Sequence, residues 1–154
     1  MAIIRIGRFC ALSMVVGLSG CGARSDGPMI TADGVRLVPG DDVCVAADVS
    51  NDALINLREV PAPAVPMNLV HLAYTQTTVG GSLATTLNVD NSFTRQLLYH
   101  AAISVTASSP AMNTDTCPVM PAVTDVELWP QAIAAIVVRD FVFRDGDQPC
   151  AYYQ

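Results

Sequence analysis

The distribution of hydrophobic and polar residues along the chain predicts short β-strands and no long helix. Apolar and polar residues alternate within most segments, and turn-forming residues interrupt the alternation roughly every ten residues. This pattern predicts an all-β domain of about seven or eight strands, built as an antiparallel two-sheet β-sandwich of the immunoglobulin-like type. The segments expected to contribute strands are 35–37, 43–49, 53–60, 68–76, 82–90, 96–106, 122–129 and 133–143. Segment 53–60 is ambiguous, because Asn51 and Asp52 before it could cap a short helix as well as turn the chain into a strand.

Turn signals indicate how some of these segments are connected. Pro39-Gly40-Asp41-Asp42 separates segments 35–37 and 43–49, so we expect these two to form the first hairpin. Gly80-Gly81 turns the chain into segment 82–90, in which Thr85, Leu87 and Val89 share one face with Leu83. That segment is therefore expected to be a half-buried strand.

Two stretches interrupt the strand pattern for longer. Three prolines fall within residues 61–66, which predicts a loop or a crossing between layers, because proline lacks an amide donor and favours extended backbone. Residues 108–121 form the longest irregular stretch of the domain. Loops of this length are either functional or held in place, and Cys117 could hold this one.

The first residues of the chain are typical of a signal peptide. Arg5 and Arg8 precede a short apolar run, residues 9–17, which is too short to span a bilayer core of ~30 Å as a helix. The segment ends Leu18-Ser19-Gly20-Cys21, which resembles the lipobox of bacterial lipoproteins. The resemblance implies cleavage before Cys21 and attachment of a diacylglyceryl group to its thiol. The alternative is an ordinary secretory signal in which Cys21 stands by chance.

The lipobox resemblance also suggests a domain organisation and a location. It implies a signal peptide at 1–20, a lipidated N-terminus and flexible tether at 21–34, and a β-sandwich domain at 35–154. Gly22 stands where lipoproteins retained in the inner membrane often carry aspartate. We therefore expect an outer membrane lipoprotein whose acyl chains hold it to the lipid bilayer, with its domain facing the periplasm.

The charge of the mature chain limits the classes of partner. Removal of the signal would leave 6 of the 8 basic residues, all of them arginine, against 14 acidic residues, a formal charge of −8. Such a surface repels nucleic-acid phosphates and anionic head groups, so nucleic-acid binding is not supported. A basic or neutral partner is favoured, although an acidic surface can also serve solubility alone.

The cysteines predict one disulfide. Cys10 leaves with the signal and Cys21 is assigned to lipid, so only three cysteines could pair in an oxidising periplasm. We expect Cys117 to pair with Cys150, since both lie in irregular segments beside prolines. Cys44 lies in an apolar alternating run and is expected to be a buried thiol. Pairing of Cys44 with Cys117 or with Cys150 is the alternative.

The sequence contains no recognisable catalytic or metal-binding motif, and we expect neither an enzyme nor a cofactor. His71 and His100 fall in predicted strands on the face opposite the apolar residues, which is typical of surface histidines. The acidic pairs Asp41-Asp42 and Asp145-x-Asp147 lack the further oxygen ligands that a calcium loop supplies. We therefore interpret both pairs as turn residues.

Three aromatic residues are candidate binding anchors. Trp129, the one tryptophan, precedes a proline, and either plugs the edge of the core or recognises a partner. Tyr152 and Tyr153 carry the same two interpretations. Together these features predict a membrane-anchored lipoprotein with a non-enzymatic binding or structural domain. The layout also resembles that of immunity lipoproteins of type VI secretion, so inhibition of a secreted toxin is the alternative, with a hydrolase third.

Overall fold

The computed structural model describes residues 27–62, 67–146 and 150, and every regular element within them is a β-strand. All strand pairings are antiparallel, so the predicted all-β antiparallel fold is confirmed. The described residues form ten strands, more than the pattern predicted because two are only two and three residues long. The strands are β1 (Met29–Ile30), β2 (Gly34–Leu37), β3 (Asp42–Ser50), β4 (Ala53–Val60), β5 (Leu69–Val79), β6 (Ser82–Asn91), β7 (Gln96–Ser104), β8 (Met112–Thr114), β9 (Thr124–Trp129) and β10 (Ala135–Arg144).

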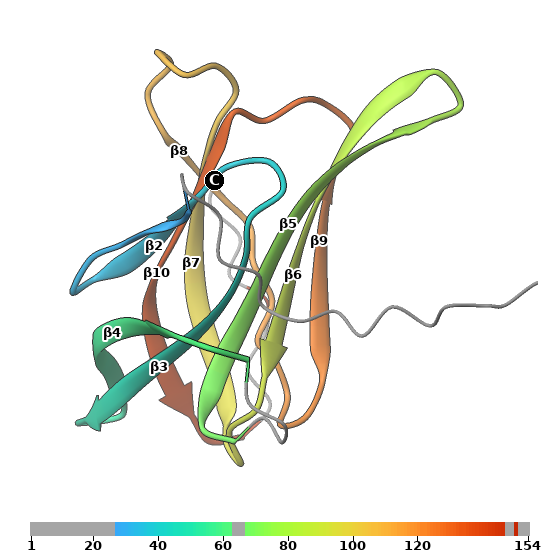
Figure 1. Cartoon of the computed structure of the whole chain (residues 1–154). Helices are drawn as coiled ribbons and strands as arrows, with labels where there is room; N and C mark the ends of the chain where they lie inside the picture. The colour runs from blue at the N-terminus through green and yellow to red at the C-terminus, as the bar shows by residue number, and fades with distance from the viewer. Residues whose placement is uncertain (1–26, 63–66, 147–149, 151–154) are drawn as a thin grey trace, which may run out of the picture.

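The strands form two layers around one hydrophobic core (Figure 1). One layer has the order β4-β3-β5-β6-β9, and the other has the order β1-β2-β10-β7-β8. The pair Val142 and Ala53 joins the layers on one flank, where β10 meets β4. On the other flank β9 lies opposite β7 and β8, and no pairing between these strands is found in the described part of the chain. We call this flank the open side of the sandwich.

Strand β10 serves both layers because a β-bulge changes which of its residues face inward. Its pairing with β7 shifts register between Arg139 and Val142, and Asp140 there has a φ of 57°. Val138 is buried before the bulge and Phe141 after it, so the inward alternation is reset. The reset lets the second half of β10 turn toward β4 while its apolar side chains stay in the core.

Two-residue turns set the register of two hairpins. Asn51 and Asp52 connect β3 to β4 with φ values of 48° and 67°, and Gly80 and Gly81 connect β5 to β6 with φ values of 59° and 86°. Positive φ at both central residues is the backbone that a tight type I′ hairpin requires, and Asn, Asp and Gly tolerate it best. The alternation predicted for 82–90 is correct, except that Leu83 lies near the turn and is exposed.

The predicted first hairpin is wrong. Strand β2 pairs with β1 and β10, whereas β3 pairs with β4 and β5, so the two segments belong to different layers. The intervening residues cross between layers: the Gly40 amide donates to the carbonyl of Tyr74, 2.8 Å away, and the Asp41 carboxylate accepts the amide of Val38 at 2.7 Å. The proline-rich segment at 61–66 instead connects β4 to β5 within one layer, although its residues 63–66 lie outside the described chain.

The predicted disulfide is present. Cys117 and Cys150 are bonded, with their Cα atoms 4.1 Å apart, and the bond attaches the end of β10 to the irregular segment before β9. Cys44 is buried as expected, at 4% exposure, but it is also disulfide-bonded, so its prediction as a thiol is wrong.

The regular structure begins before residue 35. Met29–Ile30 pairs with β2, so the last part of the segment expected to be a tether belongs to the second layer. The predicted signal peptide, Cys21 and the first part of the predicted tether lie outside the described residues. No helix in the described ranges is long and apolar enough to cross a membrane.

Candidate functional site: strand β9 and the acidic groups beside it

Strand β9 is an edge strand with inverted polarity. It pairs with β6, and the described residues provide no second neighbour for it. Val126 and Leu128 point outward and are 57% and 65% exposed, while Asp125 and Glu127 point toward the interior. The usual sheet has its polar side chains outside and its apolar ones inside. The strand therefore offers an unpaired backbone edge beside an apolar surface, which we call the β9 surface and define as Val123, Val126 and Leu128.

The two inward carboxyl groups, Asp125 and Glu127, form what we call the acid pair. The Tyr99 hydroxyl donates to Asp125 Oδ2 at 2.8 Å and lies 3.4 Å from Glu127 Oε1, and the backbone amide of Cys117 also donates to Glu127. Burial and the neighbouring charge of Asp125 raise the pKa of Glu127 to about 7. Burial, followed by the two carboxylates, raises the pKa of Tyr99 far above its ordinary value, so Tyr99 remains a donor.

A second charged cluster lies on the outer face of the same layer. His71 on β5 sits between Asp42 and Asp90, with Nε2 2.7 Å from Asp42 Oδ1 and Nδ1 2.5 Å from Asp90 Oδ2. The Thr124 hydroxyl donates to the other oxygen of Asp90 and so connects the cluster to β9. Burial alone would lower the pKa of His71, but the hydrogen bonds to the two aspartates outweigh it and raise the pKa. His71 in its charged form therefore donates to both carboxylates and ties three strands together.

Both histidines were expected to be ordinary surface residues, and His100 fits this expectation better than His71 because its side chain is more exposed. The side chain of His71 is 18% exposed, against 44% for His100, whose Nδ1 lies 3.2 Å from Asp140. The hairpin register could have revealed the His71 cluster. A two-residue turn at Gly80-Gly81 places residue 71 opposite residue 90, as the structure does.

A buried asparagine positions the start of β9. Asn91, which is almost fully buried, donates from Nδ2 to the carbonyls of Arg95 and Val119 at 2.8 and 2.9 Å. Its backbone carbonyl accepts the amide of Ala122, and its backbone amide donates to the carbonyl of Val123. These bonds attach the turn before β9 to the end of β6.

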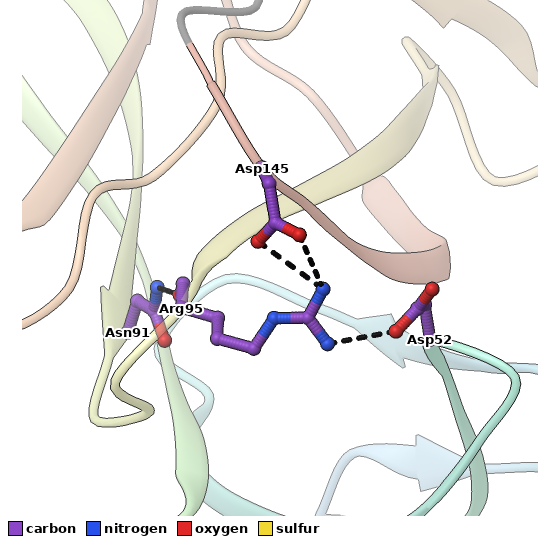
Figure 2. A network of polar contacts seen from close by, with 4 residues as sticks. All are labelled: Asp52, Asn91, Arg95 and Asp145. Carbon is purple, nitrogen blue, oxygen red and sulfur yellow. Dashed lines mark hydrogen bonds and ion pairs between the residues drawn. The ribbon is translucent and has the colours of Figure 1, made fainter.

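The same asparagine adjoins an ion-pair network (Figure 2). The Arg95 guanidinium lies between two carboxylates, 2.7 Å from Asp52 Oδ1 and 3.3 Å from Asp145 Oδ1. Arg95 also lies over the Phe143 ring, 5.2 Å from its centroid. The network joins the β3–β4 turn, the start of β7 and the end of β10. Asp145 is thus an ion-pair partner of Arg95, which is compatible with its predicted place in a turn.

Of the three predicted binding anchors, the structure describes only Trp129. Trp129 is half-buried against the core, and its indole N–H donates to Thr114 Oγ1 at 3.2 Å, so it plugs the open side of the sandwich. Tyr152 and Tyr153 lie outside the described residues, as does Asp147. No group of three or more His, Cys, Asp or Glu side chains in the described ranges is arranged to hold a metal ion.

Sequence reasoning missed the acid pair. Asp125 and Glu127 are two residues apart on a predicted strand and must share a face, but periodicity alone assigns the inward face to the apolar side chains between them. Comparison of the chain with protein-family models, with curated proteins and with solved structures finds no match to any of them.

Proposed function

We propose that the chain is a lipid-anchored, non-enzymatic periplasmic protein that binds a basic protein through the β9 surface. The observation that supports this best is the inverted polarity of an unpaired edge strand. Val126 and Leu128 expose apolar side chains where an edge strand is usually protected by charge, and open strand edges are templates for added strands.

Charge distribution favours a basic partner. Strands β5, β6 and β9 contain no arginine, and their acidic residues are Asp90, Asp125 and Glu127. The arginines of the described strands lie on β2, β4 and β10, none of which pairs with β6 or β9. A partner strand with basic side chains at alternate positions would complement the acidic side of β9 and place its apolar side chains beside Val126 and Leu128.

A second copy of this chain fits the same edge poorly. Antiparallel pairing of two β9 strands centred on Val126 would place Asp125 of each copy opposite Glu127 of the other. Like charges directly opposite each other destabilise a strand pair, and inward charges are a common protection against self-association. The expected partner is therefore a different protein with a basic surface.

Attachment to the membrane is assigned to Cys21. Each buried methylene of an acyl chain contributes about 0.8 kcal/mol, so two or three chains would hold the domain without help from the protein surface. The resemblance to lipoproteins with glycine after the cysteine favours the outer membrane. Such anchoring would leave the β9 surface available to proteins in the periplasm.

Site-specific photo-crosslinking in intact cells tests the proposal. A photoreactive residue at Leu128 is compared with one at Val49, which is 54% exposed at the far end of β3. We expect a discrete protein adduct from position 128 and none from position 49. Purified partner should then bind at least tenfold more weakly to Leu128→Glu than to Val49→Glu. Equal adducts from both positions, or adducts with lipid alone, would refute the proposal. A partner that is a secreted toxin, inactive when bound, would assign the chain to inhibitors.

A further inference from the structure

The open side of the sandwich is closed by side chains. Where the described residues of β9 face β7 and β8, the contacts are Tyr99 to the acid pair and Trp129 to Thr114. The segment 115–119 contributes the Cys117 amide, which donates to Glu127. Closure on this side therefore depends on a few polar groups, whereas β10 and β4 close the other side by backbone pairing.

The number of protons on the acid pair determines whether each hydrogen-bond donor and acceptor at this place has a partner. With one proton on Glu127, the acid donates to Asp125, Tyr99 donates to Asp125, and the Cys117 amide donates to Glu127. With no proton, two adjacent carboxylates share two donors and repel each other. Tyr99 cannot move away, because it is packed in the core and stacks on Phe141 with ring centroids 6.4 Å apart.

The surroundings of the pair supply no positive charge within the described chain. The residues opposite it on β6 are Val89 and Leu87, which are apolar and buried. From β7 it meets Tyr99, and from segment 115–119 the Cys117 amide, with the acidic Asp115 nearby in sequence and exposed.

Other charged groups near the open side are engaged elsewhere. Asp90 lies on the outer face of the layer and bonds to His71. Arg139 of β10 lies within reach of Asp140 and of Asn113 on β8. No cation therefore compensates two ionised carboxylates at this place in the described structure.

We propose that Asp125 and Glu127 form a proton-controlled latch. While the pair retains one proton, the latch holds β9 against β7 and segment 115–119. When the pair loses this proton, β9 loosens from them. The pKa of Glu127, raised to about 7, places the change near neutral pH. The inference rests on the packing of the open side and is independent of the proposed function.

Amide hydrogen exchange at pH 6 and pH 8, corrected for the intrinsic effect of pH, tests the latch. A carboxyl group with a pKa of about 7 when closed and 4.5 when exposed makes opening about tenfold more favourable at pH 8 than at pH 6. We expect this increase in β9 and in residues 116–119, with β10 unchanged. Glu127→Gln keeps the shape of the protonated acid and should abolish the pH dependence.

Two matched variants separate the latch from other titrations. Glu59→Gln removes an exposed carboxylate on β4, and His71→Gln removes the other shifted group next to β9; both should retain the tenfold effect. Equal protection of wild-type β9 at the two pH values, or a pH dependence that survives in Glu127→Gln or disappears in His71→Gln, would overturn the proposal. Carbon-13 detection of the Glu127 carboxyl in the wild-type protein provides a test that needs no variant. A pKa near 7 supports the latch, and one below 5 excludes it.

Discussion

Replacement of Glu127 by glutamine should make the domain more stable at alkaline pH and leave its stability unchanged at about pH 4. The structure raises the pKa of Glu127 from 4.5 to about 7, so the folded protein binds more protons than the unfolded chain between these values. The free energy of unfolding must therefore fall as pH rises through this window and become level above it. Glutamine resembles the protonated acid and does not titrate, so the free energy of unfolding of the variant should not show this decline.

The size of the effect follows from the shift. At about 1.4 kcal/mol per pKa unit the upper bound is roughly 3 kcal/mol, and solvent screening of a half-buried carboxyl reduces it to about 1–2 kcal/mol. We expect Glu127→Gln to match the wild type at pH 4, below the unfolded pKa, and to exceed it by about 1–2 kcal/mol at pH 8. Urea unfolding is the suitable assay, because urea adds no salt that would screen the charges.

Two observables make the measurement decisive. Trp129, the one tryptophan, lies at the end of β9 and reports on the open side by fluorescence, while far-ultraviolet circular dichroism reports on the whole sheet. Any decline with pH that remains in Glu127→Gln belongs to His71, whose raised pKa gives stabilisation that is present below 6.5 and lost as pH rises above its folded value. Parallel curves for the two proteins from pH 5 to pH 8 would show that the acid pair is not coupled to folding.

Four further predictions concern the other features. His71→Gln should cost about 1–2 kcal/mol of stability at pH 6 and less at pH 9, measured by urea unfolding at both values; an equal cost at both would exclude a charged imidazole. Cys150→Ser opens a bridge across 33 positions and should lower the unfolding free energy by roughly 3–4 kcal/mol in the chain-entropy description, without loss of the β-sheet circular dichroism signal. Asn91→Ala removes three hydrogen bonds to the backbone, those to the Arg95 and Val119 carbonyls and the one from the Phe93 amide, and should cost about 2–4 kcal/mol; a loss below 1 kcal/mol would mean that water replaces the amide. Cys21→Ser should abolish fatty-acid labelling and release the domain from membranes, and a chain starting at Ala23 should need no detergent; labelling that persists would contradict the lipobox prediction.

Local patterns predicted the eight longer strands but missed the short β1 and β8, and they could not assign all of the strands' neighbours. The Gly80-Gly81 turn determines its hairpin because both strands adjoin it, and the same arithmetic places His71 beside Asp90. Strand β2 has no such local partner. Its neighbour β10 pairs Val138 with Val35 from the opposite end of the domain, and no nearby residue signals that contact.

The acid pair was missed for a different reason. An alternating strand has two phases, and apolar content favours the phase that buries Val126 and Leu128. The structure takes the opposite phase, in which Trp129 contributes its large side chain to the core and the two carboxyl groups follow it inward. Trp129 and the two carboxyl groups therefore share the inward phase, which the count of apolar residues does not predict.

The position of β10 in the second layer also determines the order in which the fold can be completed. This strand lies between β2 and β7 and reaches β4, yet it is the last strand of the described chain. During synthesis, β2 and β7 therefore lack their common neighbour until residue 144 has been made. Contacts between distant parts of a sequence slow folding, and unpaired strand edges invite aggregation in the meantime. Until its final strand has been made, the nascent domain therefore exposes the edges of β2 and β7, to which other chains can pair.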